Sequence, residues 1–353
     1  LMQDDYPEIP DGYCMSALGW TFKTDKLGII PTLVIRGLAD RKTLKDQMIE
    51  SKKIQNSISD EREKRELEDK IIKLDAGQAA EKEMLNALFG ACGCGAFRYF
   101  DLRLAESITL TGQLSIKSVE SSINKQLQKI CKDKKDRIIA LDTDSNYIVM
   151  NDILNLIGAG NQSDLKKVEL LDQIYKTQLH PIIDATLNGL VEKLHCKKNY
   201  IIMKREGIAS KHIHLGGKVY VQYVLNSEGV QYSEPKLKIM GFVAIKSSTP
   251  ALIKTMFKET FKSLMTKDIE HTQQLIKDYK EEFKKLSIYD IAKPYGITDV
   301  EKYYDSAKVY KSGAGRHIKG ALFYNKAIKD LDLESKYNLI YSGDKIKMLN
   351  LKL

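Results

Sequence analysis

Two aspartates stand at a sharp break between apolar segments near the middle of the chain. The run Ile138–Leu141 stops at Asp142-Thr-Asp-Ser145, and a second run, Tyr147–Met150, follows at once. Apolar runs around a short polar stretch predict a β-hairpin with its polar residues at the bend. In extended backbone Asp142 and Asp144, two residues apart, would point to the same side of the pleat. Two such carboxylates suit Mg²⁺, which takes carboxylate ligands together with substrate phosphates.

Two other interpretations compete with a magnesium site at the hairpin. The same four residues would serve in an ordinary solvated turn, because Asp and Ser are favoured there. Cys92 and Cys94 form the closest pair among the five cysteines, but no second pair or nearby histidine completes a zinc site around them. The rest of the sequence has to decide between a plain turn and a metal-binding one.

The composition describes an ordinary globular protein. A length of 353 residues predicts two or three compact units, and 43% hydrophobic with 29% charged residues excludes a disordered tail. No apolar run is long enough to span a membrane, and the start, Leu1-Met-Gln-Asp-Asp5, is too acidic for a secretory signal. Five scattered cysteines favour a reducing compartment. We therefore expect a cytoplasmic protein.

Charge is distributed unevenly along the chain. Residues 197–353 contain 29 Lys and Arg against 17 Asp and Glu, whereas the first 196 residues contain 27 basic and 30 acidic groups. A basic half joined to a slightly acidic half predicts a polyanion held mainly by the C-terminal portion. A lysine-rich surface that serves solubility alone would give the same numbers.

The elements that would position these residues begin with short strands at 13–22 and 28–35. Two helices follow, joined by a polar break at 56–60 where Ser59 or Asp60 caps the second, so we expect an antiparallel helical hairpin. Arg41 and Lys45 share one face of the first helix at i and i+4. Lys82 and Asn86 share a face of the second in the same way.

Further along, helical and strand-like patterns alternate. Helical stretches are predicted at 102–131, 165–195 with a kink near Pro181, and 250–286 with Pro250 just inside the start. Strands are predicted at 200–203, 219–225 and 236–240, with a turn at 226–229. The pattern indicates an α+β fold with an antiparallel sheet.

Several ordered segments resemble the motifs of family B DNA polymerases, and Gln78-Ala-Ala-Glu-Lys-Glu-Met-Leu-Asn-Ala-Leu-Phe-Gly-Ala91 is similar to the fingers motif of that family. The Asp142-Thr-Asp-Ser145 hairpin falls where the family has its metal-binding one. Other matching segments, in family order, are Phe97–Asp101, Ala105–Thr109, Lys204–Ile208, Gly217–Tyr220, Glu234–Gly241 and Lys246–Pro250. The likeness to the replicative polymerases of T-even-type phages runs from about Gly28 to Lys326.

The resemblance implies an antiparallel palm sheet with helices, helical-hairpin fingers and a mostly α thumb. It divides the chain into an N-terminal palm remnant at 1–36, fingers at 37–91, palm at 92–245 and a partial thumb at 246–353. It also implies a DNA-directed DNA polymerase, in which two Mg²⁺ ions about 3.5–4 Å apart assist template-directed nucleotidyl transfer. Primer–template DNA and deoxynucleoside triphosphates would be its partners.

The resemblance also assigns roles to single residues. Asp144, and secondarily Asp142, would be the catalytic metal ligands, with Glu206 in support, although Glu206 could merely cap or pair with Arg205. Cations and one amide would hold the incoming nucleotide, since Arg contacts phosphate in bidentate fashion and Lys as a point charge; an ordinary exposed helix face is the alternative for the first two. The nucleotide-binding residues are Arg41, Lys45, Lys82 and Asn86, and the DNA-binding residues are Lys218, Tyr220, Lys236, Lys238 and Lys246.

The sequence departs from the family pattern in one important way. The first palm motif, which supplies the other metal-binding Asp, has no counterpart before Gly28, and Asp4, Asp5 and Asp11 lack its apolar strand. We therefore expect an N-terminal polymerase and exonuclease chain to supply that Asp, with a sliding clamp as a further candidate partner. The isolated chain should be inactive.

Smaller departures favour other interpretations. Ala87 and Phe89 lack two hydroxyls of the family pattern, and Leu141 adds bulk near the expected primer end. A non-catalytic DNA-binding polymerase remnant, or a fragment of a longer chain, are the alternatives.

Overall fold

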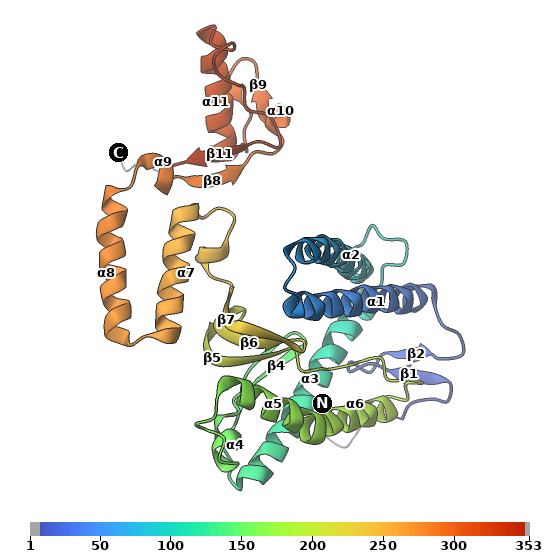
Figure 1. Ribbon diagram of the computed structural model, residues 1–353. Coiled ribbons are helices and arrows are strands. Elements are labelled where there is room, and N and C mark those ends of the chain that lie inside the picture. Colours follow the sequence, from blue (N-terminus) through green and yellow to red (C-terminus); the bar gives the residue numbers. More distant parts are fainter. Residues whose placement is uncertain (1–7, 350–353) are drawn as a thin grey trace. The chain divides into compact units, whose positions relative to one another are not determined.

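The computed structural model describes residues 8–349, and its chain folds into two compact units (Figure 1). Asp4 and Asp5, and the last four residues of the tail, lie outside the described residues. Unit 1 comprises residues 1–210 and 224–235, and unit 2 comprises residues 211–223 and 236–353. The boundaries between the units fall at residues 210/211, 223/224 and 235/236. The expected mixture of helices and antiparallel strands is confirmed.

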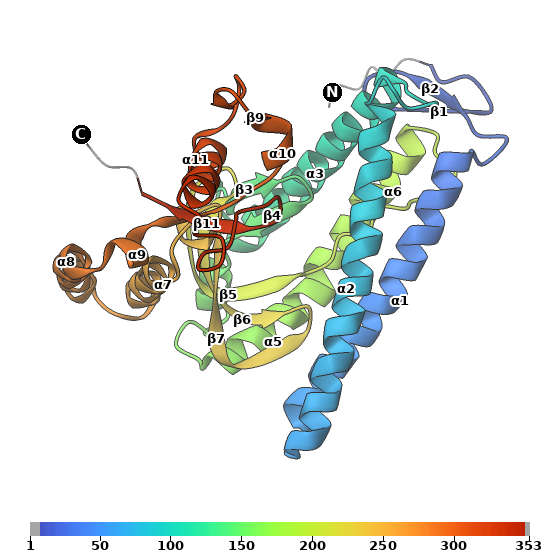
Figure 2. The ribbon, with the colours of Figure 1, turned by 90° about the horizontal axis from the view of Figure 1, so that it is seen from above.

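A long helical hairpin forms one arm of unit 1. Helices α1 (Ile29–Ser57) and α2 (Glu61–Cys92) lie side by side and antiparallel (Figures 1 and 2). The packing is close because two glycines stand at the contact. A Cβ on Gly37 would lie 3.0 Å from Leu85 Cδ2, and one on Gly77 would lie 3.3 Å from Leu44 Cδ1. These two contacts define the register of the hairpin.

The start of α1 corrects the sequence prediction. Residues 28–35 are not a strand, because α1 already begins at Ile29. Pro31 is compatible with this helix because it lies in the first turn, where backbone N–H groups have no hydrogen-bond acceptor within the helix. The N-terminal strands are instead β1 (Tyr13–Met15) and β2 (Thr21–Lys23), which pair across a turn containing Gly19 at φ 84°. Local β-propensity at 29–35 was overridden by packing of the hairpin.

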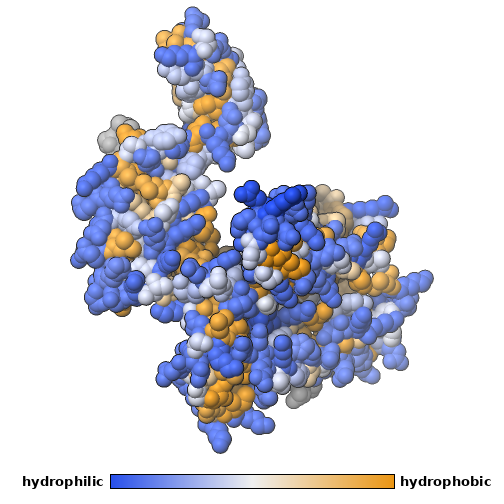
Figure 3. Space-filling model, in the orientation of Figure 1, coloured by the Kyte–Doolittle hydropathy of each residue, from blue (hydrophilic) through white to orange (hydrophobic). Residues whose placement is uncertain are grey.

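The polar break between the two long helices is confirmed. Asp60 caps α2, and its carboxylate accepts hydrogen bonds from the backbone N–H groups of Arg62 (2.7 Å) and Glu63 (3.1 Å). Figure 3 shows hydrophilic side chains gathered over this looped end of the hairpin. The charged first half of α2 therefore remains in water, as its composition predicts.

The core of unit 1 forms around α3 (Leu102–Cys131), the helix predicted at the same residues. Val119, Ile123 and Leu127 from α3 pack on Ile183 and Leu187 from α6 (His180–Lys193). Strands β3 (Ile138–Asp142) and β4 (Ser145–Ile148) rest on this core as a separate two-stranded sheet. Short helix α4 (Asn151–Leu156) follows the hairpin directly. The predicted β-hairpin is therefore confirmed.

The long helical stretch after the hairpin is interrupted, as its proline suggested. Helix α5 (Asp164–Ile174) passes through a π-helical turn, Tyr175–Leu179, into α6 (His180–Lys193). Pro181 lies at the beginning of α6, just after the π-helical turn. The strand expected at 200–203 is absent, since the described backbone there is irregular and pairing begins only at Gly207. The sheet strands are β5 (Gly207–Gly216), β6 (Val219–Ser227) and β7 (Val230–Met240), in the order β5-β6-β7.

In unit 2, one face of the sheet is covered by a helix. Val221, Ile239 and Leu237 pack with Phe261 and Met265 of the helix that follows. The predicted helical stretch at 250–286 is two helices, because Lys267–Asp268 breaks it and Asp268 caps the second. The remaining elements are η2 (Val243–Ile245), α7 (Ala251–Thr266), α8 (Ile269–Lys285), α9 (Ile288–Ile291), β8 (Lys293–Gly296), α10 (Val300–Tyr303), β9 (Tyr304–Asp305), β10 (Val309–Tyr310), α11 (Arg316–Asp330) and β11 (Lys345–Met348).

A second apolar cluster, built around Ile318, Ala321 and Leu322 of α11, holds the last of these elements together. Among the residues that the structure describes, no helix has the length and apolarity needed to cross a membrane.

A glycine at the end of β7 provides a test of the sheet's geometry. Gly241 has φ +74°, and a Cβ there would lie 2.2 Å from the carbonyl oxygen of Lys218. Gly241→Ala should lower the free energy of unfolding by at least about 2 kcal/mol, because left-handed strain adds to a backbone clash. Gly313→Ala is the matched control, since Gly313 has φ +87° but nothing within 4 Å. Urea unfolding should show the larger loss at position 241, and equal losses would contradict the geometry.

Candidate active site

The turn of the β3–β4 hairpin carries the two aspartates in unequal settings. Asp142 is the last residue of β3, pairs with Ser145 and is half-buried, whereas Asp144 lies in the turn and is exposed. Thr143, between them, has φ 52°. The backbone is therefore not extended from Asp142 to Asp144. Extended backbone, which was expected to place both carboxylates on one side of a pleat, is therefore absent at this turn.

Hydrogen bonds hold the turn in this conformation. The Thr143 hydroxyl donates to Asp142 Oδ1 (3.0 Å), and the Ser145 hydroxyl donates to the Asp142 carbonyl (3.1 Å). A β-branched residue in the left-handed region costs of order 1–3 kcal/mol and persists only where its surroundings enforce it. The hairpin therefore stores strain at the residue that separates its two carboxylates.

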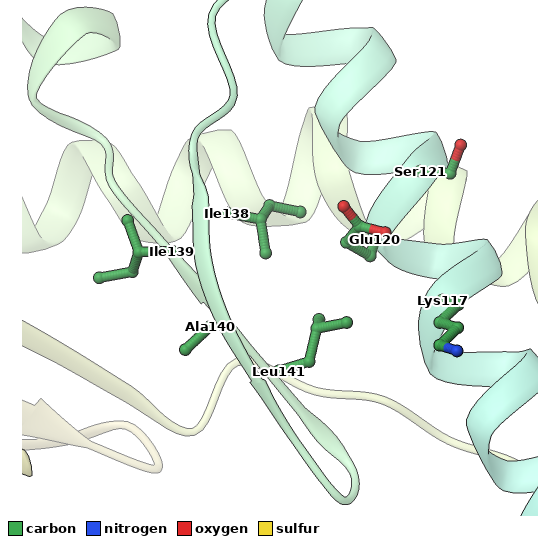
Figure 4. Close-up of a pocket in the computed structure, with 7 residues that line it drawn as sticks. All are labelled: Lys117, Glu120, Ser121, Ile138, Ile139, Ala140 and Leu141. Carbon is green, nitrogen blue, oxygen red and sulfur yellow. The ribbon is translucent and has the colours of Figure 1, made fainter. Parts of the chain in front are cut away.

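A bulge changes which side chains of β3 face the neighbouring helix. The pairing register shifts between Ile138 and Ala140. Figure 4 shows Ile138 and Leu141 on the side of α3, with Ile139 and Ala140 on the other side. Leu141 thus lines an open hollow beside α3, together with Lys117, Glu120, Ser121 and the β3 residues from Ile138 to Ala140. Bulges commonly re-aim side chains beside active sites.

The hairpin base is clamped by a buried guanidinium that sequence analysis did not single out. Arg137 is 1% exposed and contacts Asp133 through two hydrogen bonds, Nη1–Oδ1 at 2.9 Å and Nη2–Oδ2 at 2.7 Å. Its Nη2 also lies 3.0 Å from Asp152 Oδ2 of α4. Its backbone N–H donates to Asn124 of α3 (3.1 Å), and its carbonyl accepts from the N–H of Val149 (2.8 Å). One residue therefore ties the hairpin to both neighbouring helices.

Electrostatics inside this clamp follow from its hydrogen bonds. The Arg137 guanidinium lowers the pKa of Asp133 to about 2, and Asp133 raises the pKa of Arg137 in return. The pKa of Asp152 is lowered by Lys135, whose ammonium lies 2.8 Å away, and by Arg137. Asp133, Asp152 and Arg137 are therefore charged at neutral pH.

The register of the helical hairpin sets the relative heights of two of the three cations expected to hold phosphate. Its register places Arg41 at the level of Glu81, beside Lys82. Lys82 and Asn86 are exposed on α2, whereas Arg41 and Lys45 are half-buried. Arg41 Nε and Glu81 Oε2 are both buried without a hydrogen-bond partner among the described residues. Such groups call for an explanation, because a buried unpaired polar atom is costly.

Lys45 and Glu206 occupy places that the sequence did not indicate. Lys45 forms an ion pair with Glu228 in the turn between β6 and β7. Glu206 is exposed, and its carbonyl accepts from the N–H of Glu228 (2.6 Å). Arg205 contacts Asp172 Oδ1 (2.7 Å) and Asn226 Oδ1 (2.8 Å).

In unit 2, the sheet face opposite the apolar cluster is basic and aromatic. Lys236 and Lys238 alternate with the cluster residues Leu237 and Ile239 along β7, and both lysines are exposed. Tyr220 is only 5% exposed, and Lys238 Nζ lies 5.8 Å from its ring centroid. Lys218, at φ 61° in the β5–β6 turn, and Lys246 are also exposed.

Two histidines on this face were missed. His212 and His214 stack near Tyr220, with ring centroids 5.6 and 5.9 Å from it, and their nearest nitrogens are 3.3 Å apart. Burial, with His214 nearby, lowers the pKa of His212. The alternation of these two histidines with Ile213 could have indicated that they share one face of a strand. It was not used because no strand was predicted at β5.

Within residues 8–349, no group of three or more His, Cys, Asp or Glu side chains is placed to hold a metal ion. The hairpin offers hard oxygen donors of the type that Mg²⁺ prefers, but only two carboxylates.

Comparison with known proteins finds no matching family model. The chain is 28% identical to the DNA-directed DNA polymerase of Enterobacteria phage T4 and 29% identical to that of Escherichia phage RB69. These alignments cover 98% and 97% of this chain, but only 43% of each polymerase. The chain thus spans less than half the length of these relatives and corresponds to their C-terminal part. The resemblance drawn from the motifs is confirmed.

A solved structure of a family B DNA polymerase from Pyrobaculum calidifontis aligns with 98% of this chain and 36% of its own. The TM-score is 0.44 and the sequence identity 17%.

The Arg137 clamp yields a stability prediction. Arg137→Ala should lower the free energy of unfolding by about 2–3 kcal/mol, because it leaves Asp133 and Asp152 without their shared partner; both are partly hydrated, which moderates the loss. The pKa of Asp133 is depressed in the folded state, so its contribution is present above about pH 4 and is lost as the pH falls toward 2. The difference between wild type and variant should shrink over that range.

Urea unfolding at pH 7, 4 and 2.5 measures this effect. Arg62→Ala is the control, since Arg62 pairs with Glu66 on the exposed surface of α2 and should contribute nothing measurable. A wild-type and Arg137→Ala difference that stays constant down to pH 2.5 would contradict the assignment.

Proposed function

We propose that this chain is the fingers, most of the palm and part of the thumb of a DNA-directed DNA polymerase. The observation that carries the proposal is similarity along 97–98% of the chain to two phage polymerases of that name, together with the ordered motifs. In this proposal residues 37–91, within the α1–α2 hairpin, are the fingers. Residues 92–245, which include the β3–β4 hairpin, are the palm, and residues 246–353 are the partial thumb. The substrates are primer–template DNA and deoxynucleoside triphosphates.

The hairpin carboxylates are the proposed metal-binding and catalytic groups. Asp144 is exposed at the turn and available to a ligand, while Asp142 Oδ1 already accepts a hydrogen bond from Thr143. Bound Mg²⁺ would stabilise charge on the attacking and leaving oxygens of the transfer. The hydrogen-bonded turn fixes the backbone between Asp142 and Asp144. In this way it would pre-organise the two carboxylates for a metal ion.

The helical hairpin supplies the proposed nucleotide grip. Arg41 and Lys82 lie at one level of the hairpin, and Lys45 lies one turn from Arg41. A triphosphate would provide acceptors for the buried, unpaired Arg41 Nε, and would gain charge neutralisation from both lysines. Asn86, one turn beyond Lys82, would flank the base.

In this proposal a third carboxylate comes from outside the described residues, and the hairpin is suited to receive it. In the described chain β3 and β4 pair only with each other, and a lone two-stranded sheet is marginal in water. Ile139 is 50% exposed and Leu141 39% exposed along β3. An added strand that carries the missing Asp would pair with this edge and cover these side chains. That strand would belong to an N-terminal polymerase and exonuclease chain, or to a preceding part of a longer chain.

Removal of Asp144 tests the metal assignment. We expect the chain, mixed with its N-terminal counterpart, to extend a primer with Mg²⁺ and deoxynucleotides, whereas either part alone should not. Asp144→Ala should reduce extension by about a thousandfold or more, with DNA affinity nearly unchanged, because only transition-state charge stabilisation is lost. Asp69→Ala, at an exposed position of α2, is the control. Extension that survives Asp144→Ala would refute the metal assignment.

A second candidate function is DNA binding without catalysis. The basic face of the sheet, with Lys236 and Lys238 exposed, favours it independently of the hairpin. If the chain binds DNA but extends no primer with any N-terminal counterpart, DNA binding without catalysis replaces polymerase activity as the proposed function.

Both candidates require DNA to contact this face. Lys236→Ala with Lys238→Ala should weaken primer–template binding and reduce the slope of log affinity against log salt by roughly 2, since about 0.9 counterions are released per phosphate neutralised. Lys277→Ala with Lys280→Ala, on the exposed face of α8, removes the same charge as a control. Fluorescence anisotropy from 50 to 300 mM salt measures both slopes. Equal slopes for the two double variants would exclude this face.

A further inference from the structure

The turn between β6 and β7 contains a residue that its backbone conformation does not favour. β6 ends at Ser227 and β7 begins at Val230, so Glu228 and Gly229 form a two-residue loop. Their φ angles are 52° and 83°, both in the left-handed region. Two-residue hairpin loops of this type prefer Asn-Gly, Asp-Gly or Gly-Gly. Gly229 fits this rule and Glu228 violates it.

Buried hydrogen bonds keep Glu228 in this conformation. Asn226 is 3% exposed, and its Oδ1 accepts from Arg205 Nη1 (2.8 Å) and from the N–H of Gly229 (3.2 Å). Its Nδ2 donates to Gln231 (3.2 Å). Arg205 is itself held by an ion pair with Asp172 of α5. The turn is therefore rigid, and a residue that breaks a local rule in a rigid setting commonly has a functional reason.

The carboxylate of Glu228 has a specific partner on the helical hairpin. It pairs with Lys45 of α1, and the two side chains are 27% and 31% exposed. Both residues belong to unit 1. Lys45 is the lysine that the motif assigns to the triphosphate, one turn from Arg41. An ammonium group that is already paired with a carboxylate binds a second anion more weakly, because the first ion pair must be broken.

We infer that Glu228 is an internal anion that occupies Lys45 in the absence of nucleotide and that the triphosphate displaces. The inference rests on the proposed nucleotide site. A triphosphate carries several negative charges, whereas Glu228 carries one, so the triphosphate can displace Glu228 from Lys45. Its affinity is then lower than it would be without Glu228. Because the β6–β7 turn is rigid, release of Lys45 also frees α1 from that turn. Glu228 thus couples nucleotide binding to the position of the helical hairpin.

Two substitutions separate the charge of Glu228 from its role in the turn. Glu228→Asn removes the carboxylate and suits left-handed backbone better, so the fold should be retained or stabilised. Glu228→Gln removes the charge and keeps the length. Isothermal titration of the full chain, mixed with its N-terminal counterpart, uses dATP and Mg²⁺ in the presence of a chain-terminated primer on a template with thymine next. The affinity for dATP should rise about three- to tenfold in both variants. Glu234→Gln, an exposed position on β7, should leave affinity unchanged.

A double variant and a second site complete the test. In the Lys45→Ala background, Glu228→Gln should have no effect, because the competitor has lost its target. Lys82→Ala should weaken dATP binding in the wild-type chain, which verifies the nucleotide site itself. If Lys82→Ala weakens binding but Glu228 variants do not strengthen it, the proposed competition is wrong while the nucleotide site stands. If neither wild type nor Glu228→Asn binds dATP, both proposals fall.

Discussion

The hairpin that carries Asp142 and Asp144 depends on the buried guanidinium of Arg137. A two-stranded hairpin with exposed Ile139 and Leu141 has little apolar area of its own, so it needs an anchor. Arg137 supplies it through Asp133 and Asp152, and through backbone hydrogen bonds to α3 and β4. Beyond this base the chain can sustain a left-handed Thr143. The strain at the tip is tolerated because the base does not move.

The helical hairpin obeys a different constraint. Gly37 and Gly77 let α1 and α2 approach closely, and the resulting register brings Arg41 to the level of Lys82. Close packing has a cost, since Arg41 Nε and Glu81 Oε2 are buried without partners in the described chain. A nucleotide phosphate would relieve the first of these. Lys45 is different, because Glu228 already neutralises it. The three cations are therefore not equivalent.

Sequence reasoning succeeded where the signal is local. The Asp60 cap, the helix at 102–131 and the break at Asp142–Ser145 all follow from capping, period and turn chemistry. It failed at 28–35, where β-branched residues suggested a strand but packing against α2 imposes a helix. It also placed the aspartates on one side of a pleat, because nothing local predicts a positive φ at Thr143.

The contacts of the candidate site were beyond sequence reasoning because they join distant segments. Lys45 and Glu228 form an ion pair although about half of the chain separates them in sequence. In the sequence, Arg137 is one of several charged residues before a strand, and nothing there indicates its partners. The stacking of His212 and His214 beside Tyr220 can be recognised only from the pairing of β5 with β6. The motifs named the residues, but only the fold shows which of them are already engaged.

The central claim is that the hairpin carboxylates and the helical-hairpin cations hold the two ends of one metal–nucleotide complex. Crystals of the chain with its N-terminal counterpart, primer–template, dATP and Mn²⁺ would test it by anomalous scattering. We predict a manganese peak bound to Asp144, with the triphosphate between it and Arg41 and Lys82. A triphosphate bound away from α1 and α2, or manganese that does not contact Asp144, would contradict it.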